Sequence, residues 1–511
     1  MTGLPAAQAA PRNVRWILLG VMLAMLLGML DNMIIGTAMP TIVGELGGLE
    51  HLSWVVSAYT LATAASTPIW AKLGDIFGRK PNFLASIAIF LIGSGLSGAA
   101  QTMDQLIGFR VLQGIGAGGL AAGAFAIIGE LIPPRERAKY MGMTASLMAL
   151  ATIGGPLVGG FVTDHFGWRW TFYLNLPLGL VALVWCQAML HLSAKRPNAK
   201  IDYLGAALLT VTISAIVLVT TWGGTQYAWG SPQVLAMIAV VALGLPAFLW
   251  SQTRAPEPII PLSLFTSRNF ALTSVLGLVT GVAMFGAVSF VPLFQQTVQG
   301  ASASNSGLLL LPMMVPIIAV SQIAGRVMGK TGRYKIYPIL GGAFLTAGSI
   351  AMATVSTDTS RLTSGIYMAL LGAGIGFLMQ ITMMIAQNSV QMKDIGAASG
   401  TSTLFRTLGG SFGVALFGAL FNRQVTGALS GQGGGSASAG TQLDPATLST
   451  LPATIRDAYL HGVASGVHSI FTWAAVICAV GLVAALFIVD VPLRQPGAPA
   501  AAPVKEPVTQ S

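Results

Sequence analysis

Charge is scarce in this 511-residue chain: Asp, Glu, Lys and Arg make up 8% of its residues, against about 25% in soluble domains. Hydrophobic residues make up 54%. So few charged side chains cannot cover a water-facing surface of this size. The composition therefore excludes a soluble globular protein and indicates an integral membrane protein.

Cysteine and histidine are also few. The two cysteines, Cys186 and Cys478, fall in separate apolar segments, so no disulfide framework is expected. The five histidines show no metal-ligand spacing, and neither a nucleophile–base set nor a carboxylate cluster is recognisable. We therefore expect neither an enzyme nor a metal site.

What the sequence does have is a series of fourteen apolar stretches, each long enough to cross a bilayer core, which takes about 20 residues. Because these stretches are continuous rather than alternating, they predict an all-α protein with fourteen transmembrane helices and not a barrel. They centre near residues 16–42, 53–72, 82–100, 105–130, 140–163, 169–191, 203–222, 233–251, 270–298, 306–325, 337–355, 362–386, 397–422 and 463–489.

The lysines and arginines set the expected orientation. With the N-terminus inside the cell, most of the 26 fall in cytoplasmic loops, and this bias places both termini in the cytoplasm. Loop topology also accounts for the net charge of +10 without nucleic-acid binding. The exceptions are the outward-facing Arg169, Arg361, Arg423 and Arg456 and two arginines inside predicted spans, Arg110 and Arg406.

One of the 16 acidic residues differs from the others in its expected position. Asp31, within MLLGMLDNMIIGTAMP, is the one expected deep in hydrocarbon. An ionisable group at that depth is expensive, so it predicts a proton site, a cation site or both, and with it transport. A structural acid paired with a neighbouring basic group is the alternative.

A short pattern recurs in the two halves, AKLGDIFGRK at 71–80 and GRVMGKTGRYK at 325–335, so that Arg79 aligns with Arg333. It predicts two parallel six-helix halves with a substrate site between them. The expected division is a cytoplasmic tail at 1–14, a six-helix bundle at 15–192, an inserted helical hairpin with linkers at 193–268, a second bundle at 269–490 with an extracellular loop at 425–462, and a disordered cytoplasmic tail at 491–511.

The first copy of the pattern contains an acid and glycines that the positive-inside rule does not require. Asp75 can accept hydrogen bonds from a helix N-terminus, and Arg79 can bind a carboxylate, for which Glu130 is the candidate. The glycines permit a tight turn between helices. We favour a cytoplasmic latch over positive-inside topology alone. Its residues are Lys72, Gly74, Asp75, Gly78, Arg79, Lys80 and Glu130.

Further polar residues lie inside spans. Arg110 needs a partner in its apolar helix, either an acid or backbone carbonyls, and Gln113 lies one turn further along the same face. For Arg406, early in its span, snorkelling to the cytoplasmic interface and a functional role both remain open. The candidate cavity residues, for which helix-to-helix hydrogen bonds are the alternative, are Asn32, Gln295, Gln296 and Gln380.

Five motifs in chain order resemble those of the major facilitator superfamily, most closely its fourteen-helix drug:proton antiporter branch, the EmrB/QacA type. They are LDNMIIGTAMP (30–40), KLGDIFGRK (72–80), LIGFRVLQGIGAGG (106–119), GGPLVGG (154–160) and WRWTFYLNLPLG (168–179). The resemblance covers about residues 16–490 and implies the major facilitator fold, with Arg110 lying near Asp31. It also implies a cytoplasmic gate on the fifth helix of antiporters, formed by Gly154, Gly155, Pro156, Gly159 and Gly160.

The resulting hypothesis is a proton-coupled exporter of drugs or other amphipathic molecules, cations included, in a bacterial cytoplasmic membrane. Asp31 would bind a cationic substrate when ionised and release it when protonated. A proton-coupled symporter, or an exporter of a specific metabolite, lipid or siderophore, is the alternative. No cofactor is expected besides protons as the coupling ion. The expected partners are a small-molecule substrate and membrane lipid, with monomeric action, and a periplasmic or envelope partner is left open.

Overall fold

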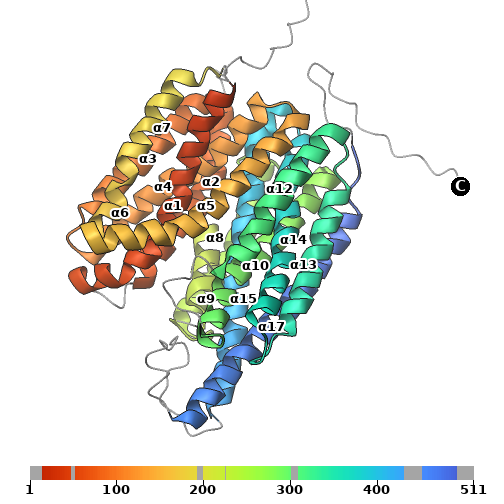
Figure 1. The fold of residues 1–511 in the computed structure, drawn as a ribbon. Helices are drawn as coiled ribbons and strands as arrows, with labels where there is room; N and C mark the ends of the chain where they lie inside the picture. The colour runs from red at the N-terminus through yellow and green to blue at the C-terminus, as the bar shows by residue number, and fades with distance from the viewer. Residues whose placement is uncertain are drawn as a thin grey trace, which may run out of the picture.

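The computed structural model describes most of the chain as helix. The described residues are 14–47, 52–192, 200–224, 226–300, 309–430 and 452–491. Apart from one β-bridge between Gly223 and Tyr227, their regular secondary structure is helical, which confirms the all-α prediction (Figure 1). The expected tails at 1–14 and 491–511 lie almost entirely outside the described residues.

The first group of helices runs from red to yellow in Figure 1. It consists of α1 (Val14–Leu46), α2 (Leu52–Phe77), α3 (Arg79–Gly98), α4 (Met103–Leu131), α5 (Pro134–Phe166), α6 (Arg169–Tyr173) and α7 (Asn175–Met189). Glycines let α4 approach both of its neighbours closely. A Cβ at Gly114 would lie 3.0 Å from the Cβ of Ala62 on α2, and one at Gly116 would lie 2.7 Å from the Cα of Phe90 on α3.

The helices α6 and α7 form one interrupted span. Pro177 has no N–H for the carbonyl of Tyr173, and its ring crowds that carbonyl, so α6 ends at Tyr173 and a new helix begins at Asn175. The interruption leaves Asn175 buried, with 2% of its surface exposed. A polar side chain is thereby placed in the interior of the first group.

The second group runs from green to blue in Figure 1. It consists of α10 (Arg268–Thr297), α12 (Leu311–Thr331), α13 (Ile336–Ala353), α14 (Arg361–Asn388), the short η4 (Met392–Asp394), α15 (Ile395–Ser430) and α17 (Ala453–Leu486). The two groups meet where α5 packs on α12 and where α2 packs on α15.

A hairpin of α8 (Tyr203–Trp222) and α9 (Pro232–Arg254), followed by η2 (Leu262–Thr266), comes between the groups in sequence. In space α8 packs on both α2 and α15, with Leu209 and Ile213 in one buried cluster with Leu404. Most of α9 faces outward. The hairpin therefore covers one side of the boundary between the two groups.

Thirteen segments of the described residues, with α6 and α7 counted together, are long and apolar enough to cross a membrane. Although α2 is equally long, it is not one of them, because it is rich in Ser and Thr and carries Lys72 and Asp75. Protein covers it, since α2 packs against α4, α8 and α15. With α2 included, each predicted span has its helix, and the chain is a multi-pass membrane protein.

Both helices that flank the predicted extracellular loop 425–462 extend into it. α15 continues to Ser430 and α17 begins at Ala453, because the two helices pack on each other beyond the apolar segments. Val425 and Tyr459 are buried in this contact. Residues 431–451, which include most of the Gly/Ser-rich stretch, lie outside the described residues.

Candidate functional site

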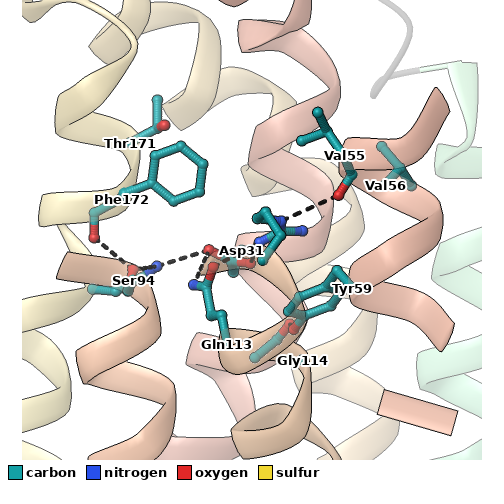
Figure 2. A network of polar contacts seen from close by, with 12 residues as sticks. Asp31, Val55, Val56, Tyr59, Ser94, Gln113, Gly114, Thr171 and Phe172 are labelled. Carbon is teal, nitrogen blue, oxygen red and sulfur yellow. Dashed lines mark hydrogen bonds and ion pairs between the residues drawn. The ribbon is translucent and has the colours of Figure 1, made fainter. Parts of the chain in front are cut away.

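Asp31 on α1 is the centre of a buried polar network (Figure 2). Its side chain is almost fully enclosed, with 3% of the residue exposed. Arg110 Nη1 lies 2.5 Å from Asp31 Oδ2, and Gln113 Nε2 and Asn175 Nδ2 each donate to Asp31 Oδ1 at 2.9 Å. The carboxylate is thus held by three donors from α4 and α7.

Arg110 is itself enclosed on several sides. Its Nη1 also donates to Gln113 Oε1 at 2.9 Å, and its Nε donates to the Val55 carbonyl at 3.4 Å. The guanidinium carbon stacks 3.9 Å from the centre of the Tyr59 ring. Residues 110 and 113 lie one turn apart on α4, which is why both reach the same carboxylate.

Asn175 belongs to this network but was not among the sequence-predicted residues. Its Nδ2 also lies 3.0 Å from Ser94 Oγ, and Ser94 in turn donates to the Phe172 carbonyl. The available signal was an asparagine two residues before a proline in an apolar run. Only the helix interruption at Pro177 turns it toward Asp31.

A cavity of ≈220 Å³ lies at the boundary between the two groups of helices. Its lining residues are Met25, Gly28, Met29, Asn32, Met33, Tyr59, Thr63, Ala117, Leu120, Ala121, Phe125, Met148, Ala151, Thr152, Met284, Phe285, Met379, Gln380, Arg406 and Thr407. Of the predicted cavity residues, Asn32 and Gln380 line it. Gln295 and Gln296 do not, because they lie about 11 residues, or roughly 16 Å, further along α10 than Met284.

Asp31 is not among the residues that line this cavity. Tyr59 separates the two: its ring stacks on Arg110, its hydroxyl donates to the Gly28 carbonyl at 3.2 Å, and both Tyr59 and Gly28 line the cavity. In this conformation the cavity therefore does not extend to the carboxylate of Asp31. Arg406, for which an interfacial and a functional position were both open, also lines the cavity.

The predicted latch residues lie together at the end of the bundle assigned to the cytoplasm. Arg79 Nη2 is 3.2 Å from Asp75 Oδ1, and Arg79 Nη1 is 3.1 Å from Glu130 Oε2. Asp75 Oδ2 accepts the backbone N–H of Ala397 at 2.9 Å, at the start of α15 in the other group. This carboxylate therefore joins α2 to the N-terminus of α15.

The remaining residues of the predicted latch have separate contacts. Lys72 pairs with Glu257 at 2.6 Å, and Lys80 donates to the Gln187 carbonyl at 2.7 Å. Gly78 joins α2 to α3 with φ = 97°, a conformation that L-residues with a side chain rarely adopt. A Cβ at Gly74 would lie 3.3 Å from Asn82 Nδ2.

Asp75 lies beyond the predicted span 53–72, and its carboxylate is buried. Burial raises the pKa of Asp75 above its ordinary value, whereas the charge of Arg79 and the Ala397 N–H act in the opposite direction. Removal of Arg79 would therefore leave a buried carboxylate without its main stabilising charge.

The glycine-rich run on α5 packs against α1, but only two of its glycines make the contact. A Cβ at Gly155 would collide with Met33, and one at Gly159 would lie 2.9 Å from the Ile34 carbonyl. Gly154 and Gly160 have open space where a Cβ would be. The run thus lets α5 approach α1 next to the residues that flank Asp31.

Comparison with known proteins places this architecture in one family. Residues 21–414 match the model of the Major Facilitator Superfamily. Multidrug resistance protein 3 of Bacillus subtilis is 34% identical over 492 residues, covering 94% of this chain and 96% of the relative. Multidrug transporter protein MdtP of the same species is 37% identical over 403 residues, covering 79% and 74%.

The fold is also found among solved structures. The proton:xylose symporter XylE superposes with a TM-score of 0.61 at 14% identity, covering 92% of this chain and 95% of that protein. At this identity the similarity shows the fold alone, which is the major facilitator fold predicted above. The chain belongs to the major facilitator superfamily and is a transporter rather than an enzyme.

Proposed function

We propose that this transporter is a proton-coupled exporter of amphipathic small molecules, of the fourteen-helix drug:proton antiporter type, acting as a monomer in a bacterial cytoplasmic membrane. The observation that carries the proposal is the buried pair of Asp31 and Arg110 behind the wall of the central cavity. The names of the relatives, a multidrug transporter and a multidrug resistance protein, agree with export.

Asp31 is the proposed proton site. When it is ionised, its charge balances that of Arg110, and three side chains donate to it. Protonation removes the counter-charge of Arg110 in a buried environment, where an unpaired cation is costly. The protonated state therefore favours a rearrangement in which Arg110 finds another partner or water.

Tyr59 is the proposed connection between the proton site and the cavity. Its ring contacts Arg110 and its hydroxyl holds α1 through the Gly28 carbonyl. A shift of Arg110 would thus move a residue of the cavity wall. Coupling through Tyr59 replaces the direct binding of substrate by Asp31 that the sequence suggested.

The latch completes the proposed cycle. In this structure the cytoplasmic ends of the two groups are in contact through Asp75 and Ala397, with Arg79 and Glu130 beside them. Export requires that this end open to admit substrate and close before release. The glycines of α5 would transmit the movement to α1, since Gly155 and Gly159 pack against it.

The proposal is tested by transport into inverted membrane vesicles with an acidic interior, for the cation ethidium and the acid 1-naphthaleneacetate. We expect wild-type vesicles to accumulate at least one probe until a protonophore is added. Asp31→Asn should reduce uptake to the level of vesicles without the protein at matched expression. Asp164→Asn, the same change at an exposed acid of α5, is the control. Protonophore-sensitive uptake that survives in Asp31→Asn would contradict the assignment of the proton site.

A further inference from the structure

Arg406 is a half-buried cation, and no acid among the described residues forms an ion pair with it. It lies on α15, eleven residues after Ile395, and lines the central cavity. Arg110, Arg79 and Arg169, by contrast, each pair with a carboxylate. Its recorded side-chain contact is with the Phe125 ring, 6.0 Å from the guanidinium carbon. An arginine in a membrane interior needs a partner, and the protein around it supplies no counter-charge.

The cavity wall is positive as a result. Arg406 is the one lining residue that carries a full charge at neutral pH, since the other lining side chains are neutral there. Asp31, the proposed proton site, does not neutralise this charge, because Tyr59 separates it from the cavity and it is already paired with Arg110. The site therefore disfavours cations and favours an anionic group.

A second polar group in the same wall is also without a partner. Gln380 on α14 is 3% exposed and lines the cavity, yet neither its Nε2 nor its Oε1 has a hydrogen-bond partner among the described residues. Both amide atoms are enclosed in this conformation, so the amide would reach a ligand by turning toward the cavity. Because a buried amide without a partner is destabilising, a ligand that completes its hydrogen bonds would favour that rotation. Its Nε2 is a donor that suits an oxyanion.

The rest of the wall suits the apolar part of a ligand. Met25, Met29 and Met33 follow one face of α1, and Met284 and Phe285 line the cavity from α10. Methionine side chains adapt to ligands of different shape. The arrangement is a soft apolar surface with a guanidinium and an amide as its fixed polar points.

We propose that the cavity recognises amphipathic organic acids, with Arg406 binding the carboxylate or sulfonate and Gln380 donating a further hydrogen bond. This rests on the proposed function in one respect, that the central cavity is the transport site. Exchange of one such anion outward for one proton inward would carry two positive charges into the cell. The membrane potential would then drive export even with Asp31 as the single proton site, whereas exchange of a monovalent cation for one proton would be electroneutral.

The test compares three probes with one naphthalene ring and different charge: 1-naphthaleneacetate, 1-naphthaleneacetamide and 2-(1-naphthyl)ethylammonium. Binding is measured by equilibrium dialysis at pH 7.5 with the full-length protein in phosphatidylcholine nanodiscs, and empty discs give the background. We expect the acid to bind about tenfold more tightly than the amide or the amine, as charge-assisted hydrogen bonds are stronger than neutral ones.

Arg406→Gln should bring the affinity for the acid down to that for the amide, with the affinity for the amide changed by less than about twofold. Retained amide binding shows that the variant is folded. Arg406→Lys keeps the charge and should keep most of the preference. Arg423→Gln, the same change at an exposed arginine of α15, should leave all three affinities unchanged.

Two results would overturn the proposal: a wild-type protein that binds the amide or the amine as tightly as the acid, or an acid preference that persists in Arg406→Gln. Binding in nanodiscs needs no proton gradient, so the outcome is independent of coupling. If Asp31→Asn and wild type transport alike but both prefer the acid, the proton site is wrong and the substrate class stands.

Discussion

Three side chains that converge on Asp31 come from two helices, and each has a different reason to be there. Arg110 balances the charge, Gln113 lies one turn along α4, and Asn175 arrives through the interruption between α6 and α7. A buried carboxylate keeps its charge only when such donors surround it. The network should therefore be sensitive to the loss of a single donor.

Asn175→Leu tests this sensitivity, because it removes one donor to Asp31 while keeping the size of the side chain. Hydrogen bonds to charged groups contribute about 1.5–3 kcal/mol, so proton-driven transport should fall about tenfold or more. Uptake into inverted vesicles measures the effect. Asn422→Leu, on α15 outside the network, is the control. Equal activity of the two variants would mean that Asn175 is a packing residue.

The same residues show how far sequence reasoning reaches. Asp31 and Arg110 were predictable because a charge in an apolar span is expensive and its position alone is informative. Asn175 was not, because an amide in a span has many uses and its direction depends on a break in the helix. For the same reason, the sequence did not distinguish Gln380, which lines the cavity, from Gln295, which lies beyond it.

At the scale of the helix, the glycine run of α5 was identified by composition, but its faces were not. A period of 3.6 residues puts neighbours on different sides, so only Gly155 and Gly159 meet α1. How closely α5 approaches α1 also depends on the residues of α1, and the sequence of α5 alone does not specify them.

This contact yields a prediction with a matched control one residue away. Gly155→Ala places a methyl group against Met33, and overpacking of this kind costs about 1–3 kcal/mol. Gly154→Ala puts the same group in open space and should be neutral or slightly stabilising. Thermal unfolding of the purified proteins in detergent measures the difference. If the two variants unfold at the same temperature, α5 and α1 are not packed as described.

The latch in the first half can be compared with the corresponding loop of the second half, which serves as its control. Arg79 joins Asp75 to Glu130, whereas its counterpart Arg333 is exposed and faces no equivalent acid, since glycine stands at position 329. The repeat predicted similar loops, and the structure shows an ion-pair network in one of them only. The missing acid in the second copy is the physical reason.

Arg79→Gln should therefore open the cytoplasmic end, and Arg333→Gln should not. The reporter is a single cysteine at Met148, a cavity residue on α5, labelled in inverted vesicles with a membrane-impermeant maleimide. The native Cys186 and Cys478 are buried, so background labelling should be low. We expect labelling to rise several-fold in Arg79→Gln. An equal rise in both variants would mean that any loss of positive charge in these loops opens this end, and that the ion pairs of Arg79 have no specific role.

At the scale of the molecule, the sequence predicted two six-helix halves and a hairpin, because apolar segments and basic loops are strong signals. It did not reveal how the groups meet. The contacts between α2 and α15 and between α5 and α12 join residues far apart in the sequence, such as Asp75 and Ala397 (322 positions) and Ser146 and Gln322 (176 positions). The hairpin covers one of these boundaries. One conformation is seen, with the ends that the sequence assigns to the cytoplasm in contact. Transport requires that it alternate with another.

A cross-link between the groups tests that requirement directly. The Cβ that a side chain at Gly400 would carry lies 2.5 Å from the Cβ of Ala71, so cysteines at these positions in α15 and α2 can form a disulfide after a displacement of about 1 Å. Oxidation of the Ala71→Cys, Gly400→Cys variant should stop uptake of the transported probe into inverted vesicles, and reduction should restore it. Each single-cysteine variant, treated with the same oxidant, controls for damage by the reagent. Because the disulfide holds only the cytoplasmic ends, full transport by the oxidised protein would show that α2 and α15 do not separate during the cycle, and the gate would have to lie elsewhere.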